Sequence, residues 1–208
     1  MSIWVCGEVL IDLLPGTPDR VAVVGGGPAN TAKALARLGH DVHFIDGIST
    51  DAGGNVNGCS CVVNSGVNVT VNSGHTLSIM NAVTNSGGVF TFENNASLVQ
   101  GPNVTVNTNS GNITYKRNTA PMRLYDYTYW SSPVSGFTLY SLSPDTVSNE
   151  YFSYNPTLGW SSISNGTATM TPGVGYILSA PRTFSNSYST VYNANFIGTY
   201  VKRVGLIA

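Results

Sequence analysis

Short runs of alternating apolar and polar residues fill the stretch from Val62 to Arg117. Alternation with a period of two is the pattern of a β-strand with one buried face. Asn-Ser-Gly or Asn-Asn steps separate the runs, and these residues tolerate left-handed backbone angles and close tight turns. The runs are residues 67–72, 76–79, 90–92, 103–107 and 112–115. Such a series predicts the stacked rungs of a β-solenoid, with tandem hairpins in a sandwich as the alternative.

A second β region is expected over residues 121–200, where aromatic runs replace the Asn-rich ones. Tyr125, Tyr127 and Tyr129 alternate in the first run, which ends at Trp130. Further short runs follow at residues 137–140, 151–155, 159–160, 168–170, 172–178 and 191–196. Seven or so short strands over about 80 residues are typical of a small β-sandwich or jelly roll.

The first 54 residues differ from the β regions in charge and in pattern. They hold nine of the 19 charged residues, whereas the following 154 positions hold ten. Soluble proteins are about a quarter charged, so the longer part is far from average. The sequence therefore predicts a mainly β chain in four parts: a short α/β segment at 1–54, a β-solenoid region at 55–120, a β-sandwich at 121–200 and a tail at 201–208.

The α/β segment is expected to run strand, strand, glycine-rich loop, helix, strand (ββαβ), which is how an α/β sheet opens. One strand is expected within residues 3–11, one at 21–24 and one at 42–45. The loop is Gly-Gly-Gly-Pro-Ala-Asn at 25–30, and the helix after it should end at Gly39. Free amides at a helix N-terminus attract oxygen-rich ligands, so this loop is either a ligand contact or a flexible turn.

Residues 1–54 closely resemble the N-terminus of the ribokinase-like (PfkB) carbohydrate kinases, and the fructokinase branch is the nearest. The resemblance rests on four stretches: Gly-Glu-Val-Leu-Ile-Asp-Leu-Leu-Pro at 7–15, the glycine-rich loop, Ala-Leu-Ala-Arg-Leu-Gly at 34–39 and Phe-Ile-Asp-Gly-Ile-Ser-Thr-Asp at 44–51. It implies sugar-binding roles for Asp12, Gly26, Gly27 and Asn30. A carboxylate and an amide suit a polyol because they accept and donate several hydrogen bonds.

The phosphate-handling half of that kinase family has no counterpart in this sequence. The resemblance implies an Asp-Thr-x-Gly-Ala-Gly-Asp stretch that supplies an anion hole and the catalytic base, and it is absent here. Phosphoryl transfer depends on positioning and on electrostatic stabilisation of the transferred group. We therefore expect a truncated kinase-like segment with no catalytic residues and no cofactor. ATP and Mg²⁺ enter only under the alternative of an active kinase.

Residues 60–199 look like the repeat-and-sandwich modules of secreted surface proteins from Bacteroidota. Among the stretches that carry this resemblance are Gly-Asn-Ile-Thr-Tyr-Lys-Arg at 111–117, Tyr-Trp-Ser-Ser-Pro-Val-Ser-Gly at 129–136 and Pro-Gly-Val-Gly-Tyr at 172–176. It implies secretion, whereas residues 1–54 imply the cytoplasm and begin without the basic region of a signal peptide. This conflict favours a chimera, a fusion of two unrelated coding segments.

Aromatic side chains are the candidate ligand contacts of the β regions. Those able to stack on glycan rings are Tyr125, Tyr127, Tyr129, Trp130, Tyr154, Trp160 and Tyr176, and we select Tyr127, Trp130 and Trp160. The alternating tyrosines before Trp130 share one face. We favour the interpretation that this face is the sandwich core with tyrosine hydroxyls at its rim, and a glycan platform is the alternative.

Other partners are less well supported. Cys59 and Cys61 are too close for ordinary disulfide geometry and lack further metal ligands at a recognised spacing, so no metal site is expected. The net charge of −1 gives no reason to expect nucleic acid, and no run approaches the roughly 20 apolar residues of a membrane helix. Carbohydrate remains the candidate partner, and the oligomeric state stays open.

Two functions are therefore weighed. The first is a non-enzymatic extracellular or cell-surface β module of the adhesion or glycan-contact type, which carries the inactive kinase-like segment. The alternative is a ribokinase-like carbohydrate kinase of the fructokinase type that phosphorylates a sugar hydroxyl with ATP.

Overall fold

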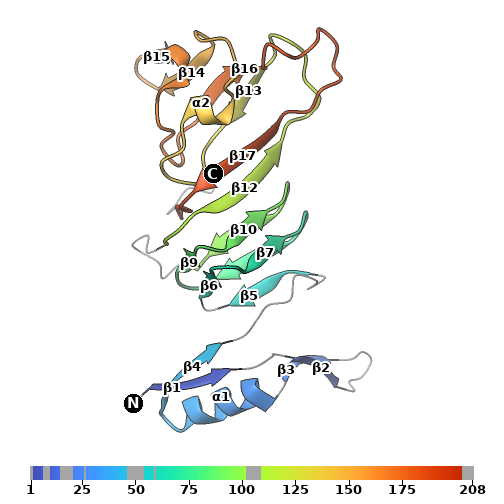
Figure 1. The fold of residues 1–208 in the computed structure, drawn as a ribbon, viewed down its shortest axis with the longest axis vertical. Coiled ribbons are helices and arrows are strands. Elements are labelled where there is room, and N and C mark those ends of the chain that lie inside the picture. The colour runs from blue at the N-terminus through green and yellow to red at the C-terminus, as the bar shows by residue number, and fades with distance from the viewer. Residues whose placement is uncertain are drawn as a thin grey trace. The chain divides into compact units, whose positions relative to one another are not determined.

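The computed structural model describes residues 2–6, 10–14, 21–25, 27–45, 54–58, 60–101 and 109–202. Within these ranges the chain is mainly β, as the sequence predicts, and it divides into two compact units, Met1–Ala52 and Gly53–Ala208 (Figure 1). None of the described helices is long and apolar enough to cross a lipid bilayer.

The described elements of the N-terminal unit are β1 (Ser2–Cys6), β2 (Leu10–Leu14), β3 (Val21–Gly25), α1 (Gly27–Arg37) and β4 (Asp41–Ile45). Strand β1 pairs with β4 in parallel, while β2 and β3 form an antiparallel pair. The apolar run predicted as one strand within residues 3–11 is thus two strands. The reason is that β1 and β2 take different partners and join different sheets.

Helix α1 ends where the sequence predicts, at Gly39. This glycine has a left-handed φ of +83°, and its N–H donates to the carbonyl of Ala36. The N–H of His40 donates to the carbonyl of Leu35 at 3.2 Å. Together these two bonds are a Schellman motif, which satisfies carbonyls that the end of a helix leaves unpaired.

Parallel ladders form the first part of the C-terminal unit. They stack β5 (Val56–Gly58), β8 (Thr76–Ile79) and β11 (Ser97–Gln100); β7 (Asn68–Val71), β10 (Val89–Phe92) and β12 (Ile113–Asn118); and β6 (Cys61–Asn64) on β9 (Val83–Ser86). Val56 pairs with Leu77 and Leu77 with Leu98, so equivalent residues lie 21 positions apart. The run predicted at 103–107 falls outside the described residues.

The second part of the unit is an antiparallel sheet in the order β13 (Tyr127–Trp130), β16 (Tyr176–Ser179), β14 (Tyr151–Asn155) and β15 (Gly159–Ser162). The remaining elements are α2 (Leu139–Leu142), a 3₁₀ turn η1 (Ser164–Gly166) and β17 (Asn193–Gly198). Strand β17 does not join this sheet. It pairs antiparallel with β12 and so extends one of the parallel ladders (Figure 1).

The strand predicted at residues 137–140 is wrong, because a helix begins there. The hydroxyl of Thr138 accepts a hydrogen bond from the N–H of Ser141 at 3.0 Å, which caps α2. Leu139 and Leu142, three positions apart, are then buried together on one side of the helix.

One hydrophobic core runs from the parallel ladders into the antiparallel sheet. Phe92 is fully buried and pairs with Val71 on one side and Tyr115 on the other. The rings of Phe92 and Tyr115 stack with centroids 5.1 Å apart, and Tyr115 in turn lies opposite Phe196 of β17. The predicted solenoid and sandwich regions therefore share their interior.

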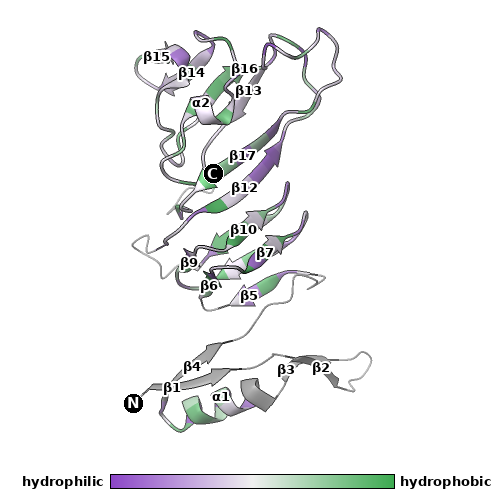
Figure 2. Cartoon of the chain, viewed as in Figure 1, coloured by the Kyte–Doolittle hydropathy of each residue, from purple (hydrophilic) through white to green (hydrophobic). Residues whose placement is uncertain are grey.

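Strand β12 passes from a hydrophobic to a hydrophilic end (Figure 2). At the hydrophilic end, Lys116 pairs with Glu93 at 2.7 Å. The guanidinium of Arg117 donates to the carbonyl of Ala96 at 2.7 Å and lies 4.2 Å from the ring centroid of Tyr115. The basic residues of β12 are thus bound within the unit and do not form a free basic patch.

Asparagine side chains tie successive rungs together at their corners. The Asn85 amide donates to the carbonyl of Asn112 at 2.6 Å and to that of Gly88 at 2.9 Å. The side-chain oxygen of Asn55 likewise accepts from the N–H of Thr76 at 2.8 Å. These bonds satisfy backbone groups at corners, where the strand ladders are interrupted.

Gly111 offers a test of this corner packing. It has a φ of +75°, and a Cβ on it would collide with the carbonyl oxygen of Asn85. We expect Gly111→Ala to lower the free energy of unfolding by about 3 kcal/mol, because the rung must shift in addition to the backbone strain. Urea unfolding followed by circular dichroism measures the loss.

Gly74→Ala is the matched control. Gly74 has a similar φ of +80°, but a Cβ on it would meet nothing within 4 Å. Only the left-handed strain applies there, so the expected loss is about 1 kcal/mol. Equal losses for the two variants would show that the close approach of Gly111 to Asn85 does not matter.

Candidate functional site

The antiparallel sheet has one face in the core and one face exposed. Along β13, Tyr127 and Tyr129 are 47% and 71% exposed, whereas Trp130 is 8% exposed. The prediction that the alternating tyrosines form the core face is therefore wrong. Trp130 takes the core position instead and packs on Phe196, with ring centroids 5.9 Å apart. The tyrosines are consequently left on the outer face.

Three rings on that outer face line an open depression, together with Gly175. We call Tyr129 of β13, Tyr154 of β14 and Trp160 of β15 the aromatic platform. The ring of Trp160 lies 4.9 Å from that of Tyr154 and 6.4 Å from that of Tyr129, measured between centroids. The platform is thus one continuous aromatic surface rather than three separate rings.

The hairpin of β14 and β15 positions two of these rings. Tyr154 and Trp160 are directly paired across the two strands, so the register of the hairpin fixes their contact. In the turn, the side-chain oxygen of Asn155 accepts from the N–H groups of Thr157 and Leu158 at 2.8 and 3.1 Å. Gly159 closes the turn with a left-handed φ of +82°.

Tyr127 lies beside the platform and is held by a carboxylate. Its hydroxyl donates a hydrogen bond to Glu150, and its ring packs on Phe152 with centroids 6.2 Å apart. The hydrogen bond to Glu150, helped by partial burial and by the negative charge of Glu150, raises the pKa of Tyr127 to about 12. The phenol therefore stays protonated at neutral pH and its ring keeps one orientation.

The structure separates the predicted stacking residues. Trp160 lies in the platform and Tyr127 beside it, while Trp130 is buried and unavailable to a ligand. Tyr129 and Tyr154 are platform members that our selection omitted. The alternation along β13 and the hairpin turn before Gly159 were the signals that placed them near Trp160.

The predicted sugar contacts of the N-terminal unit are only partly described. Asp12 lies in β2 opposite Val23 of β3. Gly27 begins α1, and Asn30 is an exposed residue of the same helix. Gly26 lies outside the described residues. The sugar-binding role of these four residues stays a prediction.

The cysteine pair is likewise described only in part, since Cys59 lies outside the described residues. Cys61 is buried, and desolvation raises the pKa of its thiol to about 11, so it is protonated at neutral pH. In the part of the chain that the structure describes, no three or more His, Cys, Asp or Glu side chains group together as metal ligands.

Comparisons with known proteins give two separate matches. A family model described as "Domain of unknown function (DUF8693)" matches residues 40–202. Fructokinases of Klebsiella pneumoniae, Salmonella typhimurium and Escherichia coli are 45%, 42% and 41% identical to this chain over 51 residues. Those 51 residues are 24% of this chain and 17% of each fructokinase, so the chain spans only a small part of these relatives. No solved structure matches this chain.

The bond between Tyr127 and Glu150 predicts a titration. Glu150→Gln removes the negative charge and supplies an amide that can donate to the phenolate, so the pKa of Tyr127 should fall from about 12 toward the ordinary value near 10. Ultraviolet absorbance of the phenolate against pH measures the change. Tyr127→Phe identifies which titration step belongs to this residue, and an unchanged step in Glu150→Gln would contradict the assignment.

The sign of the linked stability effect follows. Because the pKa of Tyr127 is higher in the folded chain, its bond to Glu150 contributes stability below about pH 10 and loses it as the pH rises through about 12.

Proposed function

Since this chain belongs to the family described as "Domain of unknown function (DUF8693)", whose description assigns no activity, we propose from the geometry that its β region is a non-enzymatic module that contacts carbohydrate. The observation that carries this proposal is the aromatic platform. Tyr129, Tyr154 and Trp160 are 71%, 50% and 49% exposed and line one depression. Contiguous exposed aromatic surface of this kind is typical of ligand sites.

The platform suits a sugar ring for a physical reason. One face of a pyranose is largely C–H groups, which pack on an aromatic face, while its hydroxyls stay in contact with water or polar groups. Tyr129 and Tyr154 combine an apolar ring with a hydroxyl, and Trp160 adds an indole N–H. Because the rings touch, they offer a continuous surface sized for one or two sugar rings rather than separated stacking points.

We also propose a finer architecture and a setting. The parallel ladders, with their offset of 21 residues, support a short β-solenoid that leads into a sandwich-like C-terminal part. The likeness of residues 60–199 to surface modules of Bacteroidota supports an extracellular or cell-surface location. The similarity to fructokinases over 51 residues, alongside a family match at 40–202, supports an origin as a chimera.

A second candidate function rests on that fructokinase similarity. Under it, Asp12, Gly27 and Asn30, with Gly26, would bind the sugar of an ATP-dependent kinase. We favour the binding module, because the matched stretch corresponds to 17% of each fructokinase.

A coupled assay with ATP, Mg²⁺ and fructose separates the two candidates. We expect no turnover from the folded chain, because the stretch that supplies the anion hole and the catalytic base in those kinases is absent from the sequence. Turnover that Asp12→Ala abolishes would instead establish the kinase.

Affinity electrophoresis in gels that contain neutral polysaccharides tests the platform. We expect the chain to be retarded in gels with soluble glucan, mannan or xylan. Trp160→Ala should weaken that binding about tenfold, because it removes the central ring of the platform.

Tyr140→Ala is the control for this experiment. Tyr140 is 54% exposed but lies on α2, outside the residues that line the platform, so its loss should leave retardation unchanged. Retardation that survives Trp160→Ala in full, or is absent in the folded native chain for all three polysaccharides, would rule out the platform as a glycan site.

A further inference from the structure

Two loops of the C-terminal unit meet away from the platform. One is residues 123–126, just before β13, and the other is residues 185–189. The N–H of Leu124 donates to the carbonyl of Ser185 at 2.7 Å, which joins them. Their side chains line a second depression, made by Arg123, Leu124, Tyr125, Asp126 and Asn186, which we call the tip site.

Tyr125 is held in a conformation that its side chain disfavours. It has a φ of +72° in a turn that the N–H of Asp126 closes on the carbonyl of Arg123 at 3.1 Å. Glycine or asparagine ordinarily fills such a position, because a Cβ is strained there. The ring is 72% exposed, so burial does not repay that strain. Strain without a packing reason is a feature of functional sites.

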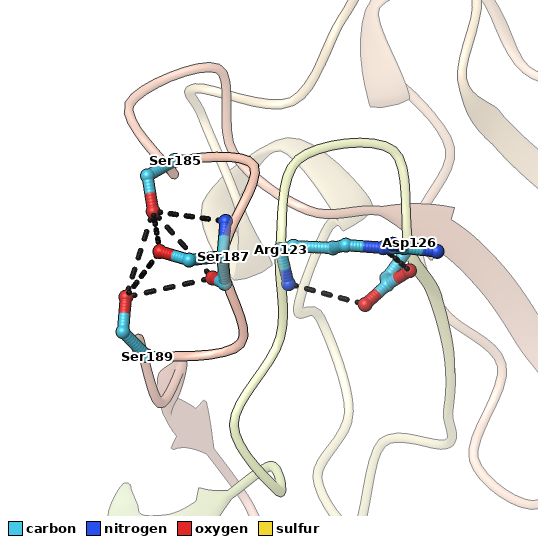
Figure 3. Close-up of polar contacts among 5 residues, drawn as sticks. All are labelled: Arg123, Asp126, Ser185, Ser187 and Ser189. Carbon is cyan, nitrogen blue, oxygen red and sulfur yellow. Dashed lines mark hydrogen bonds and ion pairs between the residues drawn. The ribbon is translucent and has the colours of Figure 1, made fainter.

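Arg123 is fixed and its charge is balanced. Its Nε lies 3.3 Å from one carboxylate oxygen of Asp126, and its backbone N–H donates to the other at 3.1 Å. The guanidinium also lies 4.7 Å from the ring centroid of Tyr188. Among the described residues its Nη groups have no acceptor, so these donors remain for a ligand. Figure 3 shows the pair beside the serine loop.

Three serines order the second loop. The hydroxyls of Ser185 and Ser187 lie 2.8 Å apart, and those of Ser187 and Ser189 lie 3.2 Å apart (Figure 3). Ser187 also donates its backbone N–H to the Ser185 hydroxyl at 3.3 Å. The loop that carries Asn186 and Tyr188 is therefore held before a ligand arrives, which lowers the entropy cost of binding.

We propose that the tip site binds a neutral sugar ring, independently of the platform. Tyr125 supplies an aromatic face, the Nη groups of Arg123 donate, and each carboxylate oxygen of Asp126 keeps an acceptor position. The amide of Asn186 does both. Vicinal hydroxyls, each a donor and an acceptor, match this set. The balanced pair of Arg123 and Asp126 gives no net charge for an anionic ligand.

An NMR titration of the ¹⁵N-labelled full chain tests the proposal, with the methyl glycosides of glucose, galactose and mannose as neutral probes and methyl glucuronide as the anionic one. At least one neutral probe should shift the amide signals of Leu124, Tyr125 and Asn186. The indole N–H of Trp160 reports the platform in the same spectra, so failure at one site is distinguished from failure at the other.

Tyr125→Gly separates a binding role from a structural one. Glycine accepts the φ of +72° without strain and removes the ring. We expect the urea midpoint of unfolding to rise, while the dissociation constant at the tip site increases at least tenfold. Trp160→Ala should leave the shifts at Leu124 and Asn186 unchanged.

Three results would each overturn the proposal. They are the absence of any shift at Leu124, Tyr125 and Asn186 with all three neutral glycosides, larger shifts there with the glucuronide, and a Tyr125→Gly variant that is less stable than the native chain. The titration of the native chain decides the first two even if the variant does not fold.

Discussion

Each parallel strand of the C-terminal unit must set its apolar residues over those of the strand 21 positions earlier, because neighbouring rungs supply one another's packing surface. A slip of one residue would turn Leu77 and Leu98 outward together. The corners enforce the same register, since Gly88 and Gly111 approach the backbone of the preceding rung too closely for a side chain. Turn chemistry and core packing therefore specify one alignment between them.

The aromatic platform depends on this register at one remove. The stack ends in β12, whose free edge is taken by β17, and this pairing brings Phe196 against Trp130. Once Trp130 fills the core, the period of β13 leaves Tyr127 and Tyr129 on the outer face. The exposed tyrosines are thus a consequence of a contact between strands 66 positions apart in the chain.

Local patterns anticipated much of the secondary structure and less of the site. The positions of β7, β8 and β10, and the end of α1 at Gly39, follow from short-range alternation and turn residues. The strand expected over 137–140 failed because the cap at Thr138 is stronger than the apolar pattern around it. Alternation along β13 defines two faces, but which face is buried depends on Phe196, which no local pattern reveals. The left-handed Tyr125 carries no sequence signal either, because its residue type argues against that conformation.

The constant offset between paired rungs has a consequence for how such a region changes in length. Insertion or deletion of a whole repeat between β5 and β11 preserves every inward position and leaves the distal sheet untouched. A single-residue insertion inside a strand reverses its faces and is costly. Related chains should therefore differ here in quantised steps of one coil, so that a ligand surface at one end can be moved outward without redesign.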